Sequence, residues 1–256
     1  MVLGIGLLMP DTGLWAPLLT MAAPVVTVGL ITLLRTPRGA RRELWSTFGL
    51  RHAGFRSWPV AFALGVLAVF VIPFGVADLL GSAHFLPWSS ISVPDVVIFL
   101  VTNLALVTLM TSAEEIGWRS YLLPRMQSLL PRRNAAIAVG FVHGLFHLPM
   151  ILFTNTYDSV GSRWIVAPAA VLTVTAAGVM YAWLKDRSGS MWPVAFAHST
   201  INTFVDGAGL VVIAAPVALT YTATESGLVT LAATAAIAAV LLVRGRTWEA
   251  THSAAR

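Results

Sequence analysis

Long apolar runs separated by short polar connections dominate the pattern of the chain. A membrane-spanning helix needs roughly 20 mostly apolar residues, and seven runs approach this description: 14–34, 58–80, 95–117, 134–154, 164–184, 191–213 and 227–243. Proline stands near several ends, as at Trp58-Pro59 and Trp192-Pro193. Periodicity within a run adds little, because a helix in lipid is apolar nearly all round. The pattern predicts an all-α fold, a polytopic transmembrane helix bundle of about seven to eight helices.

The composition excludes a water-soluble fold of this length. Of the 256 residues, 57% are hydrophobic and 11% are charged, and the mean hydropathy is +0.80. A soluble domain carries about 25% charged residues, so the expected solvent is the lipid bilayer. We find no repeat or low-complexity tract, and we expect a single membrane-embedded domain over 1–256 with a motif core at 95–213.

The basic residues are distributed in a way that predicts orientation. Although the net charge is +5, the charges fall in short clusters between apolar runs, so no nucleic-acid partner is expected. Alternate connections and the C-terminal tail hold fifteen basic residues, namely Arg35, Arg38, Arg41, Arg42, Arg51, Arg56, Arg119, Arg125, Arg132, Arg133, Lys185, Arg187, Arg244, Arg246 and Arg256. The remaining connections hold only Arg163. By the positive-inside rule, we expect the C-terminus in the cytoplasm and the N-terminus outside, across a bacterial-type plasma membrane.

Two absences narrow the function further. The chain has no cysteine, which excludes disulfides, thiolate zinc sites, iron–sulfur clusters and a cysteine nucleophile. The apolar stretch Met1–Pro10 lacks the basic residues of a cleavable signal peptide. One interpretation is that it is the tail of a further hydrophobic helix whose start lies upstream, and such a span would put both ends of the chain in the cytoplasm.

Ionisable side chains within the predicted spans are concentrated in three places. A charged group at the centre of a span costs roughly 2.5 to 3.5 kcal/mol on insertion scales, so each cluster needs a reason. The clusters are Ser112–Arg119 in the third run, His143–Pro149 in the fourth and Phe196–Asn202 in the sixth. Their presence in three helices makes them candidates for one buried site.

Helical spacing assigns faces within the acidic cluster. Glu115 and Arg119 are four residues apart, so they share a face, and we expect an ion pair that pins the helix end. Glu114 lies about 100° around the helix and is left to face another group. The alternative is that the two adjacent carboxylates form a solvated pair at the membrane boundary.

The histidine clusters repeat this spacing. His143 and His147 are four residues apart, as are His198 and Asn202. A lone histidine within a span is often a hydrogen-bonded packing residue, and we interpret His143 in this way. Functional roles are favoured for His147 and His198, because polar clusters occur in other spans. Asn202 is either a site residue or a hydrogen-bonding contact between helices.

Glutamate and histidine together support hydrolysis. A carboxylate near a histidine can hold a water molecule and take its proton, and a histidine N–H with an asparagine amide can stabilise the resulting oxyanion. Alternatively, Glu114, His147 and His198 bind a zinc ion with water in the open fourth position. The H-E-x-x-H signature of zinc proteases is absent. The residues leave both mechanisms open. No cofactor is certain, and the alternative is a divalent metal such as zinc.

At these motifs the chain resembles the CPBP family of CAAX proteases and bacteriocin-processing enzymes. That family combines E-E-x-x-x-R, an aromatic-x-x-x-H motif and H-x-x-x-N on successive hydrophobic segments, and the matching residues here lie within 114–202. The resemblance implies a catalytic Glu114 with His147 as its partner on the water. It implies that His198 and Asn202 are both oxyanion donors, or that His198 is a metal ligand and Asn202 a donor. It gives orienting roles to Glu115 and Arg119.

Two positions depart from the family pattern. His143 stands where Phe or Trp is usual, and Ser120 stands where Gly is common after the arginine. Neither change removes a catalytic group, but His143 leaves open an additional ligand or an altered pocket.

Three functions follow as hypotheses. The first is an intramembrane endopeptidase that acts on a membrane-associated or lipid-modified peptide or protein. The second is a non-catalytic immunity or regulatory membrane protein that retains the fold. The third is a transporter that uses the buried charges as a relay. The complete set Glu114, His147, His198 and Asn202 favours the enzyme, and transport is disfavoured because no inverted repeat is evident.

Overall fold

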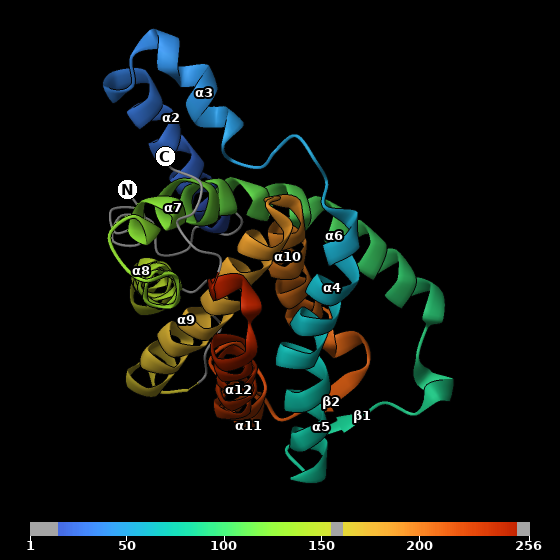
Figure 1. The fold of residues 1–256 in the computed structure, drawn as a ribbon. Coiled ribbons are helices and arrows are strands. Elements are labelled where there is room, and N and C mark those ends of the chain that lie inside the picture. Colours follow the sequence, from blue (N-terminus) through green and yellow to red (C-terminus); the bar gives the residue numbers. More distant parts are fainter. Residues whose placement is uncertain (1–14, 155–160, 250–256) are drawn as a thin grey trace.

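A computed structural model of the protein describes residues 15–154 and 161–249, and Met1–Pro10 lies outside these residues. The predicted all-α helix bundle is confirmed (Figure 1). The helices are α2 (Trp15–Arg35), α3 (Arg41–Ser46), α4 (Trp58–Val66), α5 (Ile72–Leu79), α6 (Val93–Glu115), α7 (Leu123–Gln127), α8 (Arg132–Phe153), α9 (Arg163–Ser188), α10 (Trp192–Asp206), α11 (Pro216–Thr222) and α12 (Leu228–Arg244). Two short strands, β1 (Ala83–Phe85) and β2 (Val212–Ala214), pair antiparallel.

The first five predicted spans correspond to helical segments long and apolar enough to cross a membrane. In the described part of the chain these segments are Leu18–Arg35, Phe55–Leu79, Val93–Gln127, Arg132–Phe153 and Arg163–Ser188. The second is continuous because a π-helical stretch, Leu67–Val71, joins α4 to α5. The seventh predicted span, 227–243, corresponds to α12, a shorter apolar helix.

The sixth predicted span, 191–213, is wrong in length. Helix α10 ends at Asp206, and the chain turns through Ala208–Leu210 into β2, where Ala214 pairs with Ala83 of β1. The glycines at 207 and 209 favour leaving the helix, and the two-stranded ladder then pairs backbone groups that the helix no longer pairs. Most of α10 is buried against α4, α6 and α9, so it is an interior helix and its length is not set by the bilayer.

Helix α9 forms the centre of the bundle and packs against α8, α10 and α12 (Figure 1). Its contact with α8 depends on small residues. A Cβ added to Gly140 would lie 2.6 Å from the Thr175 carbonyl oxygen, and one added to Gly144 would lie 2.6 Å from the Val171 carbonyl oxygen. Without a hydrophobic effect between helices in lipid, such close backbone contact is a main source of association. It also fixes the position of α8, which carries both histidines of the second motif.

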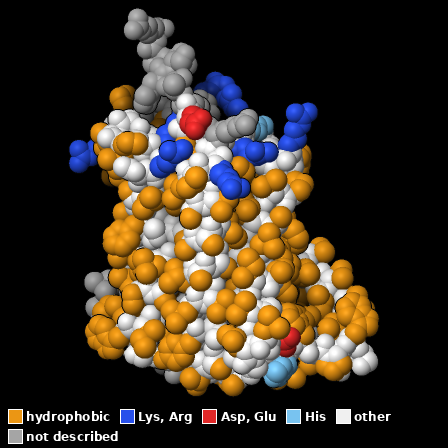
Figure 2. All heavy atoms as spheres, turned by 60° about the horizontal axis from the view of Figure 1, so that its bottom comes forward, with side chains coloured by type: hydrophobic (Ala, Val, Ile, Leu, Met, Phe, Trp, Pro, Cys, Tyr) orange, Lys and Arg blue, Asp and Glu red, His pale blue; other side chains and the backbone are white. Residues whose placement is uncertain are grey.

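The outer surface is suited to lipid. Large hydrophobic side chains are exposed along α6, for example Val97, Ile98, Val101 and Leu109. In Figure 2 hydrophobic side chains cover most of the visible face, and Lys and Arg side chains gather at one end. A soluble protein rarely exposes so large an apolar surface. The long apolar helices therefore indicate an integral membrane protein.

A buried lysine closes the end of the bundle that carries the arginines. Lys185 Nζ donates to the carbonyl oxygen of Phe48 at 2.6 Å, and Ser120 Oγ donates to the same oxygen at 2.9 Å. The following turn is tied down as well, because Met191 N donates to the Gly49 carbonyl oxygen. From its place in the chain Lys185 is expected only as a cytoplasmic charge, whereas in the structure it holds the connection after α3 against the bundle.

The close contact of α8 and α9 gives a test of the fold. Gly140→Ala should destabilise the protein by about 1–3 kcal/mol, because the added methyl group meets the Thr175 backbone and overpacks the interface. Thermal unfolding in detergent measures the change. Gly29→Ala in α2 is the matched control, since a Cβ there meets no heavy atom within 4 Å and alanine is the better helix former. An unchanged midpoint for Gly140→Ala would contradict the packing.

Candidate active site

A π-helical turn brings the acidic motif into the interior. Helix α6 continues as a π-helix over Ile116–Leu122 before α7 begins. Pro124 has no N–H to donate to the preceding turn, which favours local widening of the helix. Gly117 lets α2 approach closely, because a Cβ there would overlap Pro24. Around this turn Glu114, Glu115 and Arg119 are all buried.

The predicted pair of Glu115 and Arg119 is confirmed, and it lies in the protein interior. Arg119 Nη1 donates to Glu115 Oε1 at 3.1 Å, and both side chains are 0% exposed. The same oxygen accepts a hydrogen bond from His198 Nδ1 at 2.9 Å. The Tyr181 ring stacks on His198 and also lies under the guanidinium of Arg119. The alternative of a solvated carboxylate pair is therefore wrong for Glu115.

Glu114 faces away from this ion pair and contacts α8. His143 Nε2 lies 3.1 Å from Glu114 Oε2, and His143 Nδ1 lies 3.0 Å from Arg119 Nη1. The interpretation of His143 as a packing residue captures its burial and its stacking on Trp118, with ring centroids 4.9 Å apart. It misses the two polar contacts, because spacing gives the face of a helix but not the groups opposite it.

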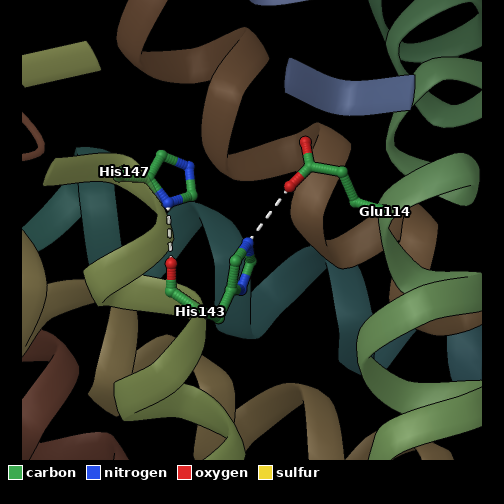
Figure 3. Close-up of side chains that lie close together, drawn as sticks. All are labelled: Glu114, His143 and His147. Carbon is green, nitrogen blue, oxygen red and sulfur yellow. Dashed lines mark hydrogen bonds and ion pairs between the residues drawn. The ribbon is translucent and has the colours of Figure 1, made fainter. Parts of the chain in front are cut away.

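His147 lies one turn further along α8, beside Glu114 and His143 (Figure 3). Its Nδ1 is 3.0 Å from the carbonyl oxygen of His143. A carbonyl only accepts, so Nδ1 carries the proton and Nε2 of a neutral ring carries the lone pair. This contact orients the ring and makes Nε2 its acceptor nitrogen.

The four predicted catalytic residues line one cavity of about 670 Å³: Glu114, His147, His198 and Asn202. His143 lines it as well, and its ring centroid is 5.8 Å from that of His198. The three motifs, which lie on α6, α8 and α10, therefore converge on one space within the helix bundle. Residues that sequence spacing could only assign to helix faces share a common volume.

Two further carboxyl groups line the same cavity. They belong to Asp206 at the end of α10 and Glu225 before α12. Burial raises the pKa of Glu225 to about 7, and the nearby Asp206 carboxylate adds to the effect. Apolar side chains line much of the rest of the cavity, with Val107, Met110 and Ile201 among them. Such a lining suits a largely apolar ligand that carries a few polar groups.

Whether these residues can bind a divalent metal depends on which histidine nitrogens carry a hydrogen and which have a free lone pair. Among the described residues, Glu114, His143 and His147 form the group whose ligand atoms lie within 4.8 Å of one another. The predicted set contains His198 instead, which is not part of this group. A metal-binding histidine normally donates its other N–H to an acceptor, as His147 does. His143 instead presents its second nitrogen to Arg119, a donor, so this arrangement does not fit a three-ligand zinc site.

Comparisons with known proteins agree with the motifs. Residues 94–204 match the family model described as type II CAAX prenyl endopeptidase Rce1-like. A protein of Methanococcus maripaludis named CAAX prenyl protease 2 is 27% identical over 211 residues, which cover 78% of this chain and 72% of that protein. The match contains all three motifs in order, and the helix bundle places them around one cavity. Over these residues the chain is therefore similar to type II CAAX prenyl endopeptidases.

Proposed function

We propose that the protein is an intramembrane endopeptidase in which Glu114 activates water for attack on a peptide bond. The observation that carries this proposal is the convergence of Glu114, His147, His198 and Asn202 on one cavity. Glu115 is occupied by Arg119 and His198, so Glu114 is the carboxylate of the motif that is placed to act as a base. A binding protein would not need a base and three further polar groups at one point.

Water activation follows from the proton positions. One oxygen of Glu114 contacts His143 Nε2, and the other is assigned to the attacking water. His147 Nε2, the acceptor nitrogen of that ring, holds the second hydrogen of the water. Glu114 takes a proton as the water oxygen bonds to the peptide carbon, and it later gives that proton to the departing amine. No step of this mechanism passes through a metal.

The oxyanion formed in this attack needs donors on the opposite side. Asn202 supplies an amide N–H₂ from the same face of α10 as His198. His198 donates from Nδ1 to Glu115, so it can donate from Nε2 only when its ring is protonated. Asn202 is therefore the donor that does not depend on protonation, and His198 strengthens the site when it is charged.

The cavity also indicates the class of substrate. A peptide within the membrane must find partners for its backbone groups, and the wall offers hydroxyl groups. Thr20 and Thr173 line the cavity, and their buried hydroxyl groups have no hydrogen-bond partner among the described residues. With the apolar wall, this favours an extended segment of a membrane-associated or lipid-modified protein. The name of the archaeal relative specifies a prenylated substrate for that protein, and the present cavity supports an apolar substrate in general.

Replacement of the base tests the enzyme directly. Glu114→Gln should lower cleavage by roughly 10²- to 10⁴-fold, because the amide cannot accept a proton. The measurement compares the N-termini of membrane proteins from cells that carry the wild type or the variant. Glu43→Gln makes the same chemical change at an exposed position and should leave the profile unchanged. Identical profiles for wild type and Glu114→Gln would favour the non-catalytic regulatory protein.

The oxyanion role of Asn202 gives a second test. Asn202→Ala should reduce the turnover number by roughly 10²- to 10³-fold, with a small effect on KM, because the lost donor acts mainly in the transition state. The substrate is the one identified by the N-terminal comparison. Asn103→Ala is the control, since Asn103 lies on α6 and donates to the Phe99 carbonyl oxygen. Full turnover by Asn202→Ala would show that Asn202 only joins helices.

The orientation follows the basic residues, and we place the C-terminus and the arginine-rich end in the cytoplasm. The chain has no cysteine, so single introduced cysteines report their side of the membrane. A membrane-impermeant maleimide should label Ser90→Cys in intact cells and should label Ser128→Cys only after lysis. Both positions are exposed. The reverse labelling would overturn the orientation without affecting the chemistry of the site.

A further inference from the structure

His143 occupies the centre of the polar groups that surround the cavity. Its side chain is 1% exposed, it stacks on Trp118, and its ring centroid lies 5.0 Å from that of His147. Both ring nitrogens are within hydrogen-bond distance of a charged side chain. A histidine that only fills space would not need two such contacts.

The partners of His143 fix the position of its proton. Arg119 Nη1 is 3.0 Å from Nδ1, and a guanidinium group has donors but no acceptor. Nδ1 must therefore accept, and the neutral ring carries its hydrogen on Nε2. Nε2 is 3.1 Å from Glu114 Oε2, so this N–H donates to the carboxylate. The ring accepts from Arg119 and donates to Glu114.

We propose that His143 is a positioning residue for Glu114: its Nε2–H bond holds one carboxylate oxygen and turns the other toward the attacking water. This inference rests on the proposed function, since it explains how the base is oriented. The orientation originates in the ion pair, because Glu115 holds Arg119 and Arg119 selects the tautomer of His143. A carboxylate with one oxygen fixed keeps a narrower range of orientations than one that rotates freely.

The proton on His143 Nε2 distinguishes this role from metal binding. The ligand atoms of Glu114, His143 and His147 are close enough to suggest a cation site. Coordination through His143 Nε2 would require the lone pair of that nitrogen, while Nδ1 still faces the Arg119 donor. The ring would then carry no proton at all. A neutral imidazole cannot meet both demands, so His143 is a donor while its contact with Arg119 persists.

The first experiment reads the tautomer and does not depend on a substrate. The full-length protein, labelled with ¹⁵N-histidine, is placed in detergent micelles, and His143→Gln identifies the signals of His143. The expected result is an Nε2–H tautomer that is unchanged by added zinc chloride, with an Nε2 signal that shifts in Glu114→Gln while the tautomer is kept. An Nδ1–H tautomer, or a shift of Nε2 on addition of zinc, would overturn the proposal and make His143 a ligand.

The second experiment measures turnover with two replacements. In His143→Gln the side-chain amide oxygen can accept from Arg119 and the amide nitrogen can donate to Glu114, so the turnover number should stay within roughly 10-fold of wild type. His143→Phe preserves stacking on Trp118 but has no donor, and its turnover number should fall roughly 10- to 100-fold with little change in KM. Thermal unfolding of both variants in detergent identifies any loss of fold.

The outcomes distinguish the failure of this inference from the failure of the proposed function. A His143→Phe variant that retains full turnover overturns the positioning role while leaving the endopeptidase intact. Loss of turnover in both variants, with folding preserved, also overturns it, because the amide then fails to replace the imidazole donor. If Glu114→Gln leaves all membrane N-termini unchanged, the proposed function fails, whereas the tautomer measurement still decides whether His143 donates to Glu114.

Discussion

The buried pair of Glu115 and Arg119 is the interaction on which the rest of the site depends. Both side chains are fully buried, and removing one partner of such a pair typically costs about 3–5 kcal/mol, because the other charge is left uncompensated. The pair also reaches two other helices: Glu115 Oε1 accepts from His198 on α10, and Arg119 Nη1 donates to His143 on α8. One ion pair therefore joins α6, the π-helical turn, α8 and α10. The four-residue spacing predicts a structural role for the pair. Through its contacts with His143 and His198, the same pair also holds the site together.

Hydropathy predicted the helices whose length is set by the lipid bilayer. It gave the wrong length for a helix that is surrounded by other helices. The first five runs gave spans because a bilayer accepts only long helices with internally paired backbones. The run at 191–213 is equally apolar, yet α10 ends at Asp206 because it packs among other helices and its chain then enters the β1–β2 ladder. Hydropathy alone does not show whether an apolar side chain is buried in lipid or in protein. Lys185 shows the same limit for charge, since its burial against the Phe48 carbonyl depends on a segment far away in the sequence.

The sequence was enough to name candidate site residues. It could not give their hydrogen-bond partners or the positions of their hydrogens. Spacing and the three motifs were enough to nominate Glu114, His147, His198 and Asn202, and all four line one cavity. The role of His143 could not be found in this way, because it depends on which nitrogen faces Arg119 and which faces Glu114. The same contacts bear on metal binding, because the side chain grouped with Glu114 and His147 is that of His143 and not that of His198. The departure from Phe or Trp at this position was the available signal, and three-dimensional contacts were needed to interpret it.

Two adjacent carboxylates serve different purposes here because a helix separates their side chains by about 100°. Glu115 is paired with Arg119, while Glu114 lines the cavity and is the proposed base. The two are nevertheless connected through Arg119 and His143, so the orientation of the base depends on the pair that stabilises the bundle. In an apolar interior this connection is strong, since charge-assisted hydrogen bonds are poorly screened there. A packing change that shifts α8 against α9 would move His143. Through His143 it would also move Glu114, with no change in the acidic motif itself. The orientation of the proposed base thus depends on helix packing, in which Gly140 and Gly144 let the backbone of α8 approach α9 closely.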